Sequence, residues 1–242
     1  NAVAFNVGTA IILWGMTGIN AITGSWQSSL VLFSAASLIL AILWLLVKFD
    51  TPAATVHAAG AEPAIYGYLE GLKDQFNWAY AFTYSGLLSF YICLFTFYPQ
   101  AGISQSKWVI GFGIVGTIAG MLYSRKNPLR LPIIRWSGLI IVITVLGLSF
   151  STQPWLQVLC AIVLGFFISV TALVSIPHEL PMMTGQKITV VFSLFWSISY
   201  LVSTIVLWVF GKLVDLSDGS YFGSFVMITI LSGTVFVGSY FL

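Results

Sequence analysis

The chain has 242 residues, of which 7% are charged and 59% hydrophobic, and its formal net charge is +2. A soluble domain carries about 25% charged residues, so this composition excludes an ordinary water-soluble protein and predicts an integral membrane protein. No nucleic-acid partner is expected, because the basic residues lie in loops between apolar runs.

Apolar runs of the length that crosses a bilayer recur along the whole sequence. A helix needs roughly 20 apolar residues to span a hydrocarbon core of about 30 Å, and only helices and closed barrels satisfy their backbone hydrogen bonds there. The eight runs are residues 2–22, 28–48, 78–98, 106–123, 133–151, 154–176, 187–210 and 221–242. We therefore predict an all-α fold, a polytopic transmembrane bundle with eight visible helices.

One connection, residues 49–77, is much longer than the others and holds most of the acidic residues. Within it, residues 66–76 are predicted to form a short amphipathic helix at the membrane surface. Two helices (residues 1–48) precede this linker and six (residues 78–242) follow it. Since apolar runs begin and end the chain, we expect it to be a piece of a longer protein.

The distribution of basic residues predicts which loops face the cytoplasm. With the loops numbered alternately, one side collects Lys48, Lys73, Arg125, Lys126, Arg130, Arg135 and Lys187, and the other only Lys107 and Lys212. Short loops rich in Lys and Arg stay in the cytoplasm. We therefore expect the loop "SRKNPLRLPIIR", the linker and both visible ends to be cytoplasmic, with the protein in a bacterial inner membrane.

Three features carry a resemblance to the major facilitator superfamily. Six helices follow a long cytoplasmic linker, "GSWQSSLVLFSAASLILAILWLL" is similar to the family's entry into its sixth helix, and "GMLYSRKNPLR" occupies the place of its basic loop motif. Gly120, Arg125 and Arg130 match that motif, whereas Ser124 and Asn127 replace its Asp and Gly. The stretch "SISYLVSTIVLWVFGKLVDLSDGSYFGSF" resembles the cyanate permease-like branch.

The resemblance implies an architecture and a function. Residues 1–48 would be the last two helices of the N-terminal half, the first four helices would be missing, and the visible helices would be the fifth to the twelfth. The chain would belong to a secondary active transporter that moves a small polar or anionic solute by alternating access. Its partners would be the solute, the lipid bilayer and the missing N-terminal helices, and Arg125 and Arg130 would have gating roles.

The third predicted helix aligns four tyrosines. At 100° per residue, Tyr80, Tyr84, Tyr91 and Tyr98 project within about 40° of one another. A buried phenol needs a partner for its hydroxyl group, so this face is predicted to line a polar path. For Tyr80 and Tyr98, near the helix ends, the alternative is the interfacial aromatic belt.

Polar faces also occur on three other predicted helices. The seventh aligns Ser193, Ser197, Tyr200 and Thr204, the sixth ends in Thr171, Ser175 and His178, and the first gathers Asn6, Thr9, Thr17 and Asn20. The alternatives are hydroxyls that bond to their own helix carbonyls and amides that bridge neighbouring helices. The family's cavity is lined by helices that include the third, sixth and seventh visible ones. The predicted substrate-binding residues are Tyr84, Tyr91, Ser197, Tyr200, Asn6 and Thr171.

Signals for other functions are weak. The stretch "GFGIVG" (111–116) resembles a dinucleotide-binding loop but has no preceding strand, so Gly116 and Gly120 are predicted to form a close helix contact. The pair His178 and Glu179 lacks a nucleophile or a second carboxylate, which favours a gating role at a cytoplasmic helix end. We expect no enzyme, no catalytic residue, no metal and no cofactor. The open alternatives are a membrane enzyme that uses His178 or Glu179 and a non-transporting receptor.

Overall fold

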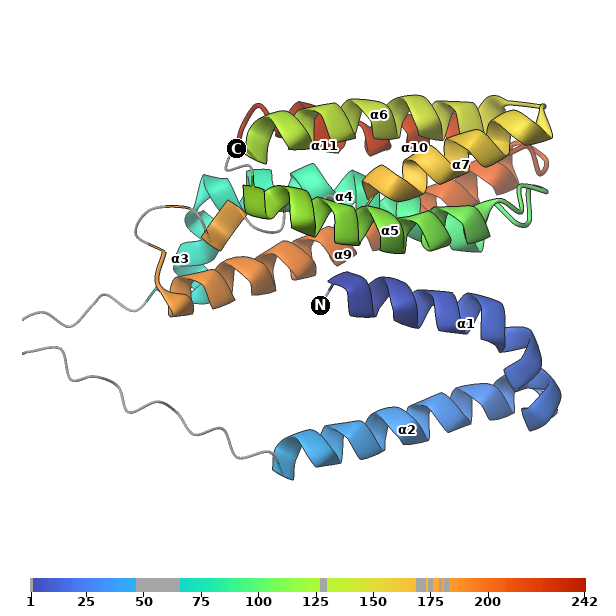
Figure 1. Cartoon of the computed structure of the whole chain (residues 1–242), viewed down its shortest axis with the longest axis horizontal. Coiled ribbons are helices and arrows are strands. Elements are labelled where there is room, and N and C mark those ends of the chain that lie inside the picture. The colour runs from blue at the N-terminus through green and yellow to red at the C-terminus, as the bar shows by residue number, and fades with distance from the viewer. Residues whose placement is uncertain are drawn as a thin grey trace, which may run out of the picture. The chain divides into compact units, whose positions relative to one another are not determined.

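The computed structural model describes residues 2–46, 66–126, 130–168, 173, 176–178, 180 and 183–242. Within these ranges the chain forms helices and turns without a strand, which confirms the predicted all-α class. The helices (Figure 1) are α1 (Ala2–Thr23), α2 (Trp26–Leu46), α3 (Tyr68–Lys73), α4 (Gln75–Thr96), α5 (Ser106–Lys126), α6 (Arg130–Phe150), α7 (Pro154–Ile168), α9 (Gly185–Leu216), α10 (Phe222–Ser232) and α11 (Thr234–Gly238).

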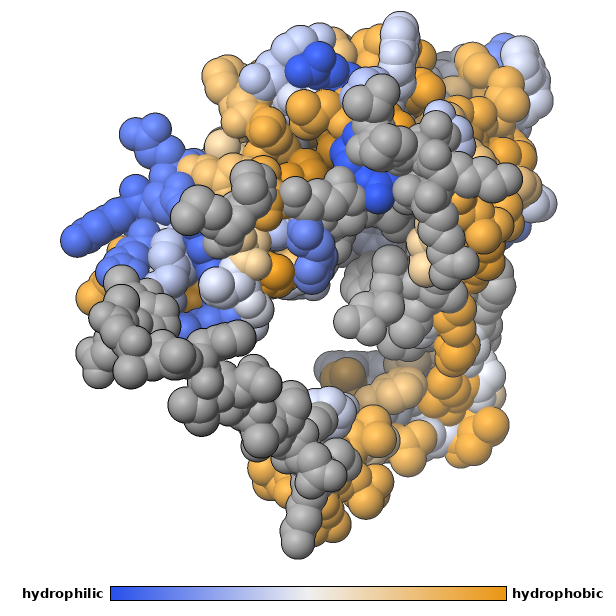
Figure 2. All heavy atoms as spheres, turned by 60° about the vertical axis from the view of Figure 1, so that its left-hand side comes forward, coloured by the Kyte–Doolittle hydropathy of each residue, from blue (hydrophilic) through white to orange (hydrophobic). Residues whose placement is uncertain are grey.

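Four of the described helices, α2, α4, α6 and α9, are long and apolar enough to cross a membrane. Three further apolar helical stretches, at residues 107–123, 154–168 and 222–238, are shorter. In the space-filling view of Figure 2, hydrophobic residues form much of the visible surface. These features suggest a membrane protein, and the count of eight spans stays a prediction.

The chain divides into two compact units, and each is described by itself. Residues 10–65 form the smaller unit, in which α1 turns into α2 at Gly24, whose φ is 79°. Ser29 is fully buried at this turn; its hydroxyl donates to Asn20 Oδ1 at 2.6 Å and lies 2.7 Å from Thr23 Oγ1. The alternative interpretation of the polar face of α1, in which amides bridge neighbouring helices, therefore holds for Asn20. Its amide oxygen joins α1 to α2.

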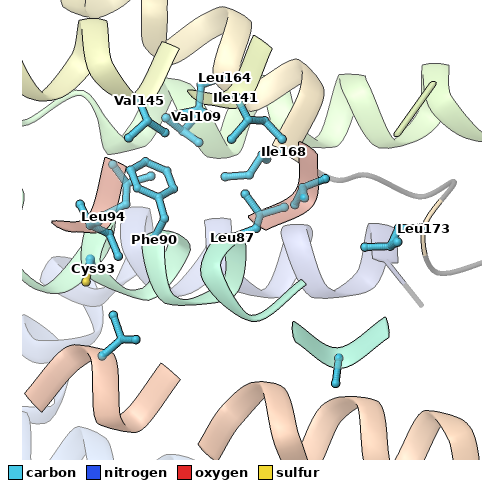
Figure 3. Close-up of a cluster of buried hydrophobic side chains, with 14 of the residues drawn as sticks. Leu87, Phe90, Cys93, Leu94, Val109, Ile141, Val145, Leu164, Ile168 and Leu173 are labelled. Carbon is cyan, nitrogen blue, oxygen red and sulfur yellow. The ribbon is translucent and has the colours of Figure 1, made fainter. Parts of the chain in front are cut away.

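The larger unit comprises residues 1–9 and 66–242. In it α4 contacts α3, α9, α10 and α11, while α6 contacts α7, α10 and α11, and α5 contacts α7. Its core, partly shown in Figure 3, joins side chains from α4, α5, α6, α7, α9, α10 and α11. The buried residues drawn there include Leu87, Phe90, Leu94, Val109, Ile141, Val145, Leu164 and Ile168.

Glycines lie where the helices of the larger unit touch most closely. Small residues let two backbones approach, and in lipid this packing replaces the hydrophobic driving force. A Cβ atom would overlap a neighbouring helix at Gly86 (against Leu231), Gly138 (Phe236), Gly116 (Phe166), Gly165 (Val109) and Gly238 (Thr83). The predicted helix contact at Gly116 is thus confirmed, and its partner is α7. Gly120 is half-buried on the same helix, and its contact stays a prediction.

Serines join α4 to α9, the pair of helices with the most extensive contact. Ser89 Oγ donates to Ser203 Oγ at 3.1 Å, and Ser199 Oγ donates to the carbonyl oxygen of Ala81 at 3.2 Å. All three serines are at most 1% exposed. These bonds hold one face of α9 against α4 and so determine which of its residues face outward.

The last predicted helix, residues 221–242, is interrupted: α10 ends at Ser232 and α11 begins at Thr234. The two polar side chains at the break bond to other groups. Ser232 Oγ donates to the carbonyl oxygen of Thr229 at 2.7 Å, and Thr234 Oγ1 donates to that of Thr83 in α4 at 3.1 Å. The glycine between them has a low helix propensity, so the continuous helix is corrected to two.

A polar network fixes the end of the linker to the larger unit. Asn77 Nδ2 donates to the carbonyl oxygen of Gly71 at 2.8 Å and to Tyr66 Oη at 3.1 Å, and Tyr66 in turn donates to Asp74 Oδ2 at 3.1 Å. Lys187 Nζ of α9 lies 5.0 Å from the centre of the Tyr66 ring. Instead of the single helix predicted over residues 66–76, α3 covers only Tyr68–Lys73, because Asp74 already caps α4 by accepting from the Phe76 backbone N–H. α3 contacts both α4 and α9.

Tyr66 makes this attachment sensitive to alkaline pH. Burial raises the pKa of Tyr66 above 10.0; the hydrogen bond from Asn77 opposes this shift and the bond to Asp74 adds to it. The unfolded chain then loses the proton first, so the contribution to stability is complete below pH 10 and is lost as the pH rises through the folded pKa. We expect Tyr66→Phe to flatten the alkaline fall in the thermal unfolding midpoint. The assignment to Tyr66 would be contradicted if the midpoint of Tyr66→Phe decreased with alkaline pH as in the wild type. It would also be contradicted if Tyr68→Phe, at an exposed tyrosine nearby, reduced the decrease equally.

Candidate functional site

The most distinctive polar surface of the larger unit combines residues of α4 and α9. Tyr84 and Tyr91 are seven residues apart and so lie within about 20° on one face of α4. On α9, Trp196, Ser197 and Tyr200 lie outside the face that Ser199 and Ser203 bind to α4. We call Tyr84, Tyr91, Trp196, Ser197 and Tyr200 together the tyrosine face.

Three rings of the tyrosine face, those of Tyr84, Trp196 and Tyr200, form a contiguous cluster. The Trp196 ring centre lies 5.6 Å from that of Tyr84, with the two planes at 85°, and 5.9 Å from that of Tyr200, with the planes at 30°. Tyr84 also packs on Phe195 at 5.1 Å. Tyr91 lies two turns further along the same face of α4 and packs on Phe95, with ring centres 4.8 Å apart. Side chains that are more than a hundred residues apart in sequence therefore meet on one surface.

The exposed part of this surface is on α9. Trp196 is 39% exposed and Tyr200 is 47% exposed, and Ser197 between them is also exposed. Tyr84 and Tyr91 are partly buried beside them. The structure thus joins Tyr84 and Tyr200 through Trp196, and the central cavity that these residues, Tyr91 and Ser197 are predicted to line stays a prediction.

The other two tyrosines of the predicted stripe have internal partners. Tyr80 is fully buried and donates to the carbonyl oxygen of Leu173 at 3.2 Å. Tyr98 is also fully buried, and its hydroxyl lies 2.6 Å from Ser149 Oγ. Neither residue is exposed, as a residue of an interfacial belt or of a hydrated path would be, so neither interpretation holds for these two tyrosines. On α9, Thr204 donates to its own helix, to the carbonyl oxygen of Tyr200 at 2.9 Å.

The predicted gating residues are less fully described. His178 is exposed, and its ring centre lies 5.4 Å from that of Phe192 near the start of α9. Arg130 is half-buried at the first position of α6. The backbone of Arg125 belongs to α5 and that of Asn6 to α1, but their side chains lie outside the described set, as do Thr171 and Glu179 altogether.

Sequence reasoning missed the serines that join α4 to α9, although a signal for them exists. Ser85 and Ser89 are four residues apart on α4, and Ser199 and Ser203 have the same spacing on α9. This is the spacing of small residues that pack two membrane helices together. The predicted polar face of Ser193, Ser197, Tyr200 and Thr204 on α9 obscures this signal. That face has four residues, including a tyrosine, whereas the buried pair has only two serines.

The described residues contain no group of three or more His, Cys, Asp or Glu side chains that could hold a metal ion. Comparisons with protein-family models, with curated proteins and with solved structures find no match for this chain. The functional argument therefore rests on the residues and on their geometry.

Proposed function

We propose that this chain belongs to a secondary active transporter of the major facilitator type, which moves a small polar or anionic solute by alternating access. The observation that carries the proposal is the tyrosine face. Two long apolar helices place three phenols, an indole and a serine on one surface, and polar groups facing only lipid would cost free energy. Contact with a hydrated solute path accounts for this arrangement.

The architecture that we propose with this function has eight spans in the visible chain. The loops that hold Lys73 and Arg130 face the cytoplasm of a bacterial cell, because short basic loops are retained there. The N-terminal half would supply the other wall of the path. We propose no enzymatic role, since the described polar groups of the tyrosine face include no nucleophile paired with a base.

Accessibility of Ser197 from both sides of the membrane tests the proposal. In a variant without native cysteines, Ser197→Cys is expected to react with an impermeant maleimide in right-side-out and in inverted vesicles, because alternating access exposes the face to each side in turn. The matched control is Ile205→Cys, an apolar position on α9 that is 55% exposed and should react from neither side.

Two outcomes would count against the proposal. Failure of Ser197→Cys to react from either side would mean a dry helix contact, and reaction from one side only would mean a fixed cleft. The orientation is measured in the same vesicles. Lys73→Cys should react only from the cytoplasmic side and Lys107→Cys only from the opposite side, and the reverse pattern would overturn the proposed topology.

A further inference from the structure

The tyrosine face combines aromatic rings and hydroxyl groups without a formal charge. α4 contains no Asp, Glu, Lys or Arg, and α9 contains none between Lys187 and Lys212. Charged residues deep in a membrane protein are costly, and these two helices avoid them. On these two helices, only rings and dipoles are available to hold an ion at this face.

The rings form two walls at about a right angle. Trp196 and Tyr200 make one wall, with their planes 30° apart, and Tyr84 makes the other, at 85° to Trp196. Trp196 and Tyr200 are 39% and 47% exposed, so part of the ring surface on this wall is open to a ligand. Tyr91, two turns along the same face of α4, adds a third phenol.

The sign of charge that such walls favour follows from their electrostatics. An aromatic ring has a negative face, which attracts cations and repels anions, and tryptophan attracts cations most strongly. An anion at this face would meet no Lys or Arg from α4 or from the uncharged part of α9. The chain already uses the favourable pairing elsewhere, because the Arg135 guanidinium lies 4.3 Å from the Tyr240 ring centre and Lys187 lies 5.0 Å from that of Tyr66.

The absence of a carboxylate in α4 and in the uncharged part of α9 narrows the kind of cation. A primary ammonium carries three N–H donors that need acceptors close to one another, whereas the hydroxyls of Tyr84 and Tyr91 stand on residues about 10 Å apart along the axis of α4. A quaternary ammonium has no N–H group, and its methyl groups can contact the rings directly. We propose that the tyrosine face binds the methylated ammonium group of the solute. This inference rests on the proposed function and narrows the solute to a polar molecule with such a group.

Choline and its uncharged carbon analogue 3,3-dimethyl-1-butanol test the inference, because they have the same shape and differ in charge. With the purified full chain in lipid nanodiscs, choline is expected to bind at least about 10-fold more tightly than the analogue, as a cation–π site requires. Trp196→Leu should weaken choline binding by about 10-fold or more.

The matched control is Trp208→Leu, at a tryptophan of the same helix that is 65% exposed and should leave choline binding unchanged. If Trp196→Leu lowers the thermal unfolding midpoint, the milder variant Trp196→Phe is used in its place. It is expected to weaken choline binding several-fold. Equal affinity for choline and the analogue would overturn the inference, and so would normal choline binding in both Trp196 variants.

Failure of this inference can be distinguished from failure of the proposed function. A wild-type protein that binds no choline, while Ser197→Cys still reacts from both sides of the membrane, contradicts only the ammonium site. Choline binding that depends on Trp196, together with labelling of Ser197→Cys from one side, supports the site and contradicts alternating access.

Discussion

Replacement of Gly116 by leucine is expected to lower the free energy of unfolding by about 3 kcal/mol, at the upper end of the range for overpacked cores. A Cβ atom at this position in α5 would overlap the backbone of Phe166 in α7. A flexible side chain could move aside, but a helical backbone can move only if the two helices separate. The yield of monodisperse protein and the thermal unfolding midpoint in detergent measure this effect.

Alanine at two glycines gives a matched comparison. Gly223, in the first turn of α10, has no neighbouring atom within 4 Å of an added Cβ atom. Gly223→Ala should therefore be neutral or gain up to about 1 kcal/mol from the higher helix propensity of alanine, whereas Gly116→Ala should be destabilising. Similar midpoints for the two alanine variants would refute the close contact. Normal stability of Gly116→Leu would also revive the dinucleotide interpretation of "GFGIVG".

Loss of the Asn77 amide is expected to cost about 2 kcal/mol, since the variant removes two hydrogen bonds that a buried nitrogen makes to Gly71 and Tyr66. Asn77 is 1% exposed, and its nitrogen bonds to both Gly71 and Tyr66. Asn77→Ala should therefore release α3 from α4 and α9. A lower unfolding midpoint and faster hydrogen exchange over Tyr68–Lys73 would report this release, whereas Gln75→Ala at an exposed position should change neither.

The variant Asn77→Asp keeps the shape of the side chain and removes its nitrogen donor, so it tests which of the two stabilises the protein. Asn77 Oδ1 is buried and has no hydrogen-bond partner among the described residues, so the stabilising role belongs to the nitrogen. Asn77→Asp replaces that donor by an ionised oxygen, and it should be at least as destabilising as Asn77→Ala at neutral pH. Its stability should recover in acid, because burial favours the protonated carboxyl, which can donate. Wild-type stability of this variant at neutral pH would show that the donor is dispensable.

Local features of the chain follow from the amino-acid sequence alone. The membrane character follows from composition, and the helices follow from the length of the apolar runs, because backbone hydrogen bonds in lipid must be made within a helix or a closed barrel. The alignment of Tyr84 with Tyr91 follows from the rotation per residue. The helix contact at Gly116 is predictable for a similarly local reason, since a small residue in an apolar helix permits close approach of a second helix.

Only the tertiary structure decided which side chains have internal partners. Tyr80 and Tyr84 lie on one face of α4 by periodicity, yet Tyr80 is buried and bonded to Leu173, whereas Tyr84 joins the tyrosine face. On α9, the exposed Tyr200 and the buried Ser199 are adjacent in sequence, and they differ because Ser199 bonds to α4. Helical periodicity gives the direction in which each side chain points from the helix axis. Which other helix, if any, lies in that direction is set by long-range packing. For that reason the sequence determined the helices and their polar faces, and the packing of α4 against α9 determined which of those faces remained open.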